Sequence, residues 1–244
     1  MVYKIGLENG DENRSIAWVL GHPGCFAYGP NGDSALKNTS AAIHDYITWI
    51  KDHNQGECWI PENEIQISVD DVWEVYAIDE NYDRVEKGYS VNAWFHHDWK
   101  ALTSEDLDQG FKLLSWSRAD LLEIIQDLDQ NTLDKTFPDE RWSIAGIINH
   151  IGGAEWWYLD RLGLAFPRED LPEDPFQRLP VVRNRLLQVL SNLVGSYQVV
   201  GVEGEFWSPR KLLRRAVWHE RDHAAHIQKL LYPQLTTRNQ PDWV

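Results

Sequence analysis

The apolar residues of this chain change their spacing near residue 100, and this change constrains the fold more than any other feature. Before it, apolar and polar residues alternate, as from Tyr3 to Leu7, which is typical of half-buried strands. From Thr103 onward, apolar residues recur at steps of three and four, which is typical of amphipathic helices. We therefore predict two domains, an α+β domain over residues 1–98 and an all-α four-helix bundle over residues 99–244.

The first domain is predicted to contain one small sheet and one helix. The run 15–20 looks like a partner for the strand at 3–7, and two further strand-like runs span 64–69 and 72–78. Between them, Asp33 or Ser34 can cap a helix from about residue 35 to residue 52. Its apolar positions fall on one face, which would pack on the sheet: Leu36, Thr39, Ile43, Tyr46, Ile47 and Ile50.

The second domain is predicted to contain four amphipathic helices of about 20 residues each, which is enough for a bundle. Thr103 and Asp106 have the spacing of a capping box at the start of the first helix. The last helix has a hydroxyl cap followed by proline at its first position, and Pro233 blocks its continuation. The four helices are expected to begin at Thr103, near Ser143, after the segment 171–180 and at Ser208–Pro209, and the last to end near Leu231.

Two histidines on the last predicted helix, His219 and His223, are four residues apart and therefore lie on one face, one turn apart. That spacing lets two imidazole nitrogens converge on one ion at about 2.0–2.1 Å. Such a pair alone is a weak signal, and a third ligand must come from another helix. His150, on the second predicted helix, is our candidate, so the predicted metal ligands are His150, His219 and His223.

Small residues near His150 leave room for an ion and a substrate. Gly153 is predicted to lie on the same side of the helix, and Trp157 could form a wall of the substrate pocket. Three neutral nitrogens leave at least one coordination position open, which distinguishes a catalytic site from a closed structural one. His226, one turn beyond His223, either hydrogen-bonds to the ligand shell or adds a fourth ligand that closes the site.

Two charged residues are candidates for catalysis, Glu220 and Arg118. Glu220 follows a predicted ligand and either orients an imidazole, acts as a base or is a solvated surface charge. Arg118 lies on the apolar stripe of the first helix, so it projects inward and needs an anionic partner. That partner is either a substrate or a carboxylate of the chain itself, Glu155 or Asp160.

The composition argues against several classes of binding partner. A formal net charge of -15 argues against nucleic acids and anionic membrane surfaces, and no run approaches the roughly 20 apolar residues of a membrane span. The two cysteines, Cys25 and Cys58, form no CxxC pair, and the sequence shows no secretory leader, so we expect a cytoplasmic protein without a disulfide framework. We expect a small-molecule substrate.

The stretch Gly24-Cys25-Phe26-Ala27-Tyr28-Gly29, leading through Ser34-Ala35-Leu36 into the helix with Ala41-Ala42-Ile43, resembles the HicB-like antitoxin fold. Members of that family show a similar glycine-bounded strand before an alanine-rich helix. The resemblance covers about 50 residues, and the alternative is a generic small α+β domain. It implies a basic protein partner, which the acidity of this chain would suit.

Three segments of the C-terminal half carry a second resemblance: 113–121, 142–158 and the run from Trp218 to Ile227. In order and spacing they are similar to the DinB-like metal-binding bundles, a family related to thiol-dependent transferases. The resemblance implies that His150, His219 and His223 bind a divalent metal ion, zinc or nickel first and iron as an alternative. The family usually has glutamine where this chain has His226, and the resemblance also implies a homodimer.

These observations leave two classes of function. The first is a metal-dependent enzyme, either a transferase using a low-molecular-weight thiol or a hydrolase. The second is a regulatory or toxin–antitoxin-like module in which the first domain binds a protein and the metal only stabilises the bundle. No helix-turn-helix or DNA-binding arm is evident in the sequence, which weakens the second.

Overall fold

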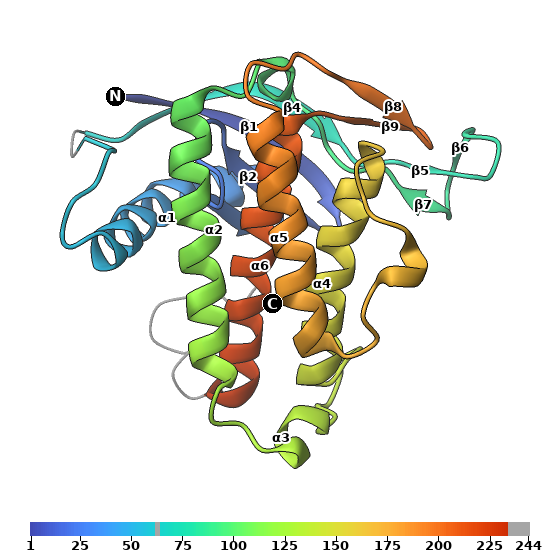
Figure 1. Ribbon diagram of the computed structural model, residues 1–244. Helices are drawn as coiled ribbons and strands as arrows, with labels where there is room; N and C mark the ends of the chain where they lie inside the picture. Colours follow the sequence, from blue (N-terminus) through green and yellow to red (C-terminus); the bar gives the residue numbers. More distant parts are fainter. Residues whose placement is uncertain (62–63, 234–244) are drawn as a thin grey trace. The chain divides into compact units, whose positions relative to one another are not determined.

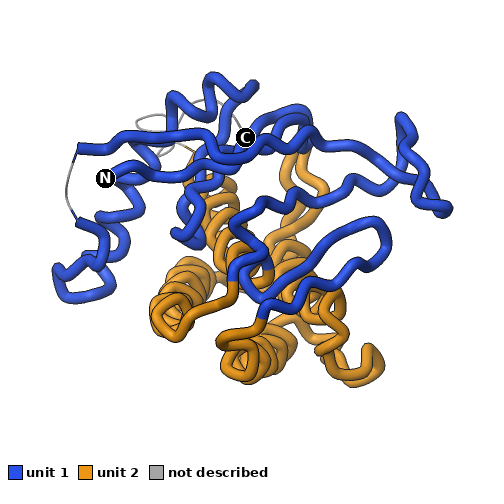
Figure 2. Tube along the Cα trace, turned by 90° about the horizontal axis from the view of Figure 1, so that it is seen from above, with its two compact units in different colours: residues 1–100, 197–211, 242–244 blue, residues 101–196, 212–241 orange. Residues whose placement is uncertain are grey.

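The computed structural model describes residues 1–61 and 64–233. Its contacts divide these residues into two compact units, coloured separately in Figure 2. Among the described residues, the first unit comprises 1–61, 64–100 and 197–211, and the second comprises 101–196 and 212–233. A single boundary at residue 98 therefore does not describe the units, because the segment 197–211 returns to the first one.

A four-stranded sheet forms the centre of the first unit, with strand order β3-β2-β1-β4. β1 and β2 pair antiparallel, as do β2 and β3, whereas β4 is parallel to β1. The runs predicted as two strands, 64–69 and 72–78, are instead joined through Asp70 and Asp71 into one strand over residues 66–74, and residues 77–78 form a separate short strand. β4 lies at the sheet edge, where Asp70 is exposed and Asp71 accepts a hydrogen bond from the His96 amide. The strands are β1 (Val2–Asp11), β2 (Arg14–Val19), β3 (Phe26–Gly29) and β4 (Gln66–Glu74).

Helix α1 (Gly32–His53) follows β3 and packs on β1, β2 and β3. Its buried face contains five of the six residues predicted from the spacing, with Ala35 in place of Leu36. The cap is Asn31, whose side chain accepts a hydrogen bond from the Ser34 amide, so the prediction of Asp33 or Ser34 was wrong by two or three positions. Gly29 is required because a Cβ there would lie 2.3 Å from the Ala35 nitrogen.

Short elements complete the first unit, and the hairpin β8–β9 was not predicted. Glu205 of β9 is buried, and its carboxylate accepts hydrogen bonds from Tyr89, Asn92 and Trp207. The bonds from Tyr89 and Asn92 attach the hairpin to the remainder of the first unit. The elements are β5 (Ala77–Ile78), β6 (Arg84–Val85), β7 (Tyr89–Ser90), the 3-10 helix η1 (His96–Trp99), β8 (Val200–Val202) and β9 (Glu205–Trp207).

Four long helices make up most of the described part of the second unit, and Figure 1 shows them running alongside one another. The predicted helical domain is thus confirmed. The two predicted caps also form, Thr103 with Asp106 and Ser208 with the Lys211 amide. Ser143, near which a helix was expected to begin, accepts a hydrogen bond from the Gly146 amide. The helices are α2 (Ser104–Ile125), α4 (Ile144–Arg161), α5 (Pro175–Asn192) and α6 (Pro209–Leu231), with the short α3 (Gln130–Asp134) and η2 (Arg168–Asp170) between them.

Helix α5 begins earlier than its sequence pattern predicts. Asp174 caps it through the Phe176 and Gln177 amides, and the helix continues through Pro180. The hydrophobic core between the helices of the second unit includes Leu121, Ile147, Ile148 and Ile227.

Among residues 1–61 and 64–233, no helix has both the length and the apolar character needed to cross a bilayer.

Candidate metal centre

Helices α4 and α6 bring the three predicted ligands together. The His219 Nε2 atom lies 3.0 Å from His150 Nε2 and 3.2 Å from His223 Nε2. The three ligand atoms all lie within 4.8 Å of one another. His219 is buried, whereas His150 and His223 are partly exposed, so the cluster opens toward solvent on the side of these two rings.

The geometry of the three rings fits a shared cation better than a hydrogen-bonded chain. A ring nitrogen has either one proton or one lone pair, so His219 Nε2 cannot form good hydrogen bonds to both neighbours. Nitrogens bound tetrahedrally to one ion at about 2.0–2.1 Å lie roughly 3.3–3.4 Å apart, close to the two distances observed. The rings are steeply inclined, with His219 and His223 at 83° and His150 and His223 at 90°. Three nitrogen donors at these positions therefore suit one divalent ion.

Aromatic side chains enclose two of the three imidazoles. Trp142 stacks on His150 with ring centroids 4.5 Å apart, and Tyr158 meets His219 edge-on at 5.8 Å. Burial lowers the pKa of His219 well below its ordinary value, and His223, His150 and Arg215 lower it further. Burial, and then Arg141, also lower the pKa of His150. Both imidazoles are therefore held in the neutral form that a metal requires.

Two guanidinium groups lie near the cluster, each stacked over a tryptophan that contacts one of the histidines. Arg141 lies over the Trp142 ring at 4.6 Å, and Arg215 lies over the Trp218 ring at 4.4 Å. Trp218 is in turn tilted against His219 at 5.8 Å. The chain carries a net charge of -15, yet the surroundings of the three histidines include two positive groups.

His226 lies outside the cluster of ligand atoms. Its Nε2 atom lies 3.0 Å from the Glu140 carboxylate, in the segment that precedes α4. Its ring centroid is 6.2 Å from that of His223. His226 is therefore not one of the three clustered ligands, and its role as a hydrogen-bonding neighbour of the ligands or as a fourth ligand stays a prediction.

Glu220 and Arg118, the two catalytic candidates, meet each other in a buried ion-pair network. Glu220 accepts hydrogen bonds from the Ser117 hydroxyl at 2.6 Å, from Arg118 Nε and from Arg183 Nη2 at 2.8 Å. The carboxylate is therefore fully engaged, and the positive charges lower its pKa despite burial. Arg118 also lies 3.5 Å from Glu155, one of the structural partners predicted for it.

Sequence reasoning missed Arg183, whose guanidinium forms two hydrogen bonds to Glu155, each of 2.9 Å. A signal for it existed. Arg183 lies on the buried stripe of α5 between Leu179 and Leu186, as Arg118 does on the stripe of α2. A charged residue on an apolar stripe requires an opposite charge on a facing helix.

The two residues predicted to line a substrate pocket have neighbours of their own. Trp157 packs edge-on against Tyr158, and Arg161 lies over its ring at 4.8 Å. At Gly153 a Cβ would lie 3.8 Å from Arg178 Nη1, so the side chain of Arg178 runs past this glycine. Their role toward a substrate stays a prediction.

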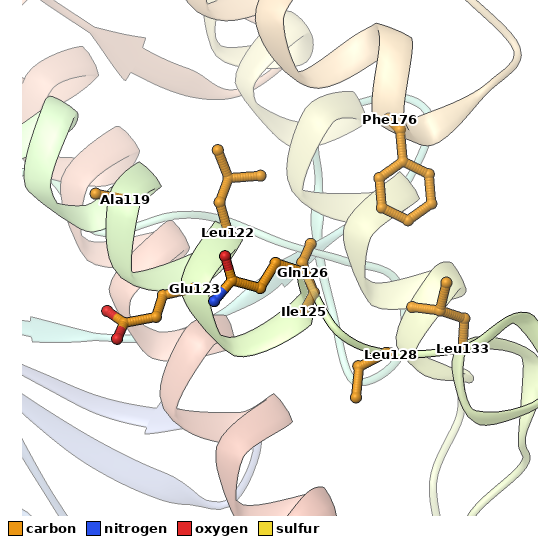
Figure 3. A pocket seen from close by; sticks show the side chains of 8 residues that line it. All are labelled: Ala119, Leu122, Glu123, Ile125, Gln126, Leu128, Leu133 and Phe176. Atoms are coloured by element: carbon orange, nitrogen blue, oxygen red, sulfur yellow. The ribbon is translucent and has the colours of Figure 1, made fainter.

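A separate surface pocket of about 520 Å³ lies in the second unit, and Figure 3 shows its lining. It is lined mainly by apolar side chains of α2, α3 and α5, and none of the three histidines contributes to it. Its residues are Ala119, Leu122, Glu123, Ile125, Gln126, Leu128, Leu133 and Phe176.

Residues 113–227 match the family model described as the DinB superfamily, so the C-terminal region contains a domain of that superfamily. A protein of Oceanobacillus iheyensis that carries the provisional name of a metal-dependent hydrolase is 25% identical over 150 residues, which is 52% of this chain and 86% of that protein. The HicB-like resemblance of the first domain stays a prediction.

Two solved structures are also similar to this chain. One is YfiT from Bacillus subtilis, provisionally described as a metal-dependent hydrolase with an unusual four-helix bundle topology. It has 18% identity and a TM-score of 0.45, over 56% of this chain and 91% of that one. The other is TT2238, a four-helix bundle protein, with 22% identity and a TM-score of 0.41, over 50% of this chain and 98% of that one.

Proposed function

We propose that this protein binds one divalent metal ion through His150, His219 and His223 and uses it to hydrolyse a small molecule. The observation that carries the proposal is the convergence of three Nε2 atoms, with separations of 3.0 and 3.2 Å, from two helices. The name of the Oceanobacillus iheyensis relative, a metal-dependent hydrolase, supports the reaction class.

The donor set fits this group. Three neutral imidazoles suit zinc, nickel or iron, and zinc or nickel is our first choice. When bound, such an ion supplies Lewis acidity, which favours hydrolysis near neutral pH. With three protein ligands and His226 engaged by Glu140, a position remains for a substrate group.

The chain's own residues would hold and orient the substrate. Trp142 and Tyr158 fix the rings of His150 and His219 by contact and keep water from their buried sides. Arg141 and Arg215 add positive charge at the flanks, which favours a substrate with an anionic group. Glu220 has no role as a base in this proposal, because its carboxylate oxygens are occupied by Ser117, Arg118 and Arg183.

The alternative is a transferase reaction at the same centre, in which a low-molecular-weight thiol is the cosubstrate. It would use the same histidines, and the flanking arginines would bind the carboxylates of the thiol cosubstrate. Hydrolysis is preferred because the relative's name points to it.

The first test is metal content. We expect the purified chain, loaded with zinc and passed through a desalting column, to retain about one ion per chain. His219→Ala should lose it. His44→Ala, which removes an exposed histidine of α1, is the matched control and should keep it. A wild-type chain that retains no zinc, nickel or iron would refute the proposal.

The second test separates an enzyme from a regulatory module with a structural metal. Visible spectra of the cobalt-substituted chain should change when azide or a small thiol is added, because the proposed centre has an exchangeable position. Ester and amide substrates, and then thiol-dependent conjugation, should be screened with the metal-loaded chain. A cobalt spectrum indifferent to all ligands, with no turnover, would favour the regulatory module.

A further inference from the structure

Four buried charges, one from each long helix, form a closed network in the second unit. Arg118 lies on α2, Glu155 on α4, Arg183 on α5 and Glu220 on α6. Arg183 bonds both carboxylates, through Nε and Nη2 to Glu155 and through Nη2 to Glu220 at 2.8 Å. Arg118 bonds Glu220 through Nε and lies 3.5 Å from Glu155. We call these four residues the charge quartet.

The quartet is electrically neutral and almost inaccessible to water. The exposed fractions of the side chains are 1% for Glu220, 4% for Glu155, 8% for Arg183 and 12% for Arg118. Each charge therefore depends on its partners in the network, because a charge that lost them would stay desolvated without compensation, at a large cost. Sliding any one helix by a turn, about 5.4 Å, would break its ion pairs with two others.

The network includes both helices that carry the candidate metal ligands. Glu220 directly follows His219 on α6, and Glu155 lies about one and a half turns after His150 on α4. The two arginines come from α2 and α5, which supply none of the three histidines. Each arginine reaches both carboxylates, so α4 and α6 are held in register by charges from the other two helices.

We propose that the charge quartet is a positioning device for the metal centre: it fixes the register of α4 against α6 and so brings His150 to His219 and His223. This inference rests on the proposed function. It assigns the quartet a role that stability alone would not require, because a buried ion-pair network can often be replaced by apolar residues without loss of stability. Apolar residues, however, impose no directional contacts, so the register of the helices would be less well defined.

Replacing the ion pairs with apolar residues should therefore separate a positioning role from a role in stability. In a quadruple variant, Arg118→Met, Arg183→Met, Glu155→Leu and Glu220→Leu replace all four charges together, so that no charge remains unpaired. Zinc affinity is measured by competition with a chromogenic chelator, and denaturant unfolding of the metal-free chains reports stability. We expect an unchanged unfolding midpoint and a loss of about tenfold or more in zinc affinity. The cobalt spectrum should also differ from that of the wild type. A folded variant with wild-type affinity and spectrum would overturn the inference.

A second variant covers the case in which the quadruple variant does not fold. Arg183→Lys keeps one positive charge but cannot form the two-pronged contact with Glu155. Arg185→Lys is its control, because Arg185 lies on the same helix and its Nε atom donates a hydrogen bond to the Leu164 carbonyl, away from the charge quartet. We expect Arg183→Lys to weaken zinc binding by about threefold or more and Arg185→Lys to leave it unchanged.

Equal affinities for these two variants would overturn the positioning role. Failure of the proposed function looks different: there the wild-type chain itself would bind no zinc, and both proposals would fall together. Zinc bound normally by the wild type and by all quartet variants would refute the positioning role alone.

Discussion

The Nε2 atoms of His150 and His219 lie 3.0 Å apart, although 69 positions separate these residues in the sequence. Both imidazoles are neutral because burial lowers the pKa of each. An ion bound between them would therefore connect α4 to α6 without first displacing protons at neutral pH. Binding and stability of the second unit should be linked as a result.

Added zinc should therefore raise the melting temperature of the wild-type chain. At a free zinc concentration 100 times the dissociation constant, the gain in free energy of unfolding is about 2.7 kcal/mol. His150→Ala should remove the zinc-dependent gain, because only His219 and His223 remain. His44→Ala should keep it. Differential scanning calorimetry with and without a chelator measures the effect, and equal gains in both variants would contradict the prediction.

Replacing His226 should leave the metal content unchanged. Its partner is Glu140, and both side chains are partly exposed, at 21% and 27%. We expect His226→Gln to retain the same number of zinc ions per chain as the wild type. The free energy of unfolding should fall by no more than about 1 kcal/mol. Loss of the metal in this variant would identify His226 as a fourth ligand.

His22 should make the first unit less stable in acid. Burial lowers its pKa from 6.5 to about 4. The unfolded chain therefore binds the proton more tightly, so the contribution of His22 is complete above pH 6.5 and is lost as the pH falls toward 4. The loss is at most about 3 kcal/mol.

Urea unfolding at pH 7 and pH 4.5 measures this dependence, and His22→Gln should weaken it. The imidazole can also be titrated directly by NMR. A His22 pKa near 6.5 in the folded chain would contradict the prediction.

Glu205 should be essential for attaching the β8–β9 hairpin. Glu205→Ala would leave the buried indole of Trp207 and the half-buried donors of Asn92 without this acceptor, at a cost of up to about 1–3 kcal/mol for each. We expect the free energy of unfolding to fall by about 3 kcal/mol or more. Glu80→Ala, which removes an exposed carboxylate of the same unit, is the control. Similar stability of the two variants by urea denaturation would argue against this role.

The long helices could be predicted because their ends carry local signals. Thr103, Ser143 and Ser208 each accept a hydrogen bond from a backbone amide, and such caps depend on neighbouring residues only. β4 was harder to predict, since Asp70 and Asp71 interrupt its apolar pattern. Asp70 is exposed at the sheet edge, and Asp71 accepts a hydrogen bond from the distant His96 amide. The β8–β9 hairpin has only three residues in each strand, too few for a pattern.

The metal ligands of the candidate site could be predicted from the sequence, but the buried ion-pair network beside them could not. His219 and His223 share a helix face by spacing alone, whereas His150 was a candidate by its place on another helix and was supported by the family resemblance. The stripe position of Arg118 indicated a buried ion pair. The stripe position of Arg183 gave the same local signal, but it did not identify Glu155 and Glu220 as partners, because the partner of a buried charge is decided by which helices become neighbours. Long-range contacts of this kind are the part of the site that one sequence does not specify.

The return of residues 197–211 to the first unit affects how this protein can be synthesised and divided. The sheet and α1 are synthesised early. Tyr89 and Asn92, however, cannot form their hydrogen bonds to Glu205 until most of the chain has been made. Folding strictly from the N-terminus can therefore produce only an incomplete first unit. For the same reason, a gene cut at residue 100 would give two fragments that each lack contacts held by the other.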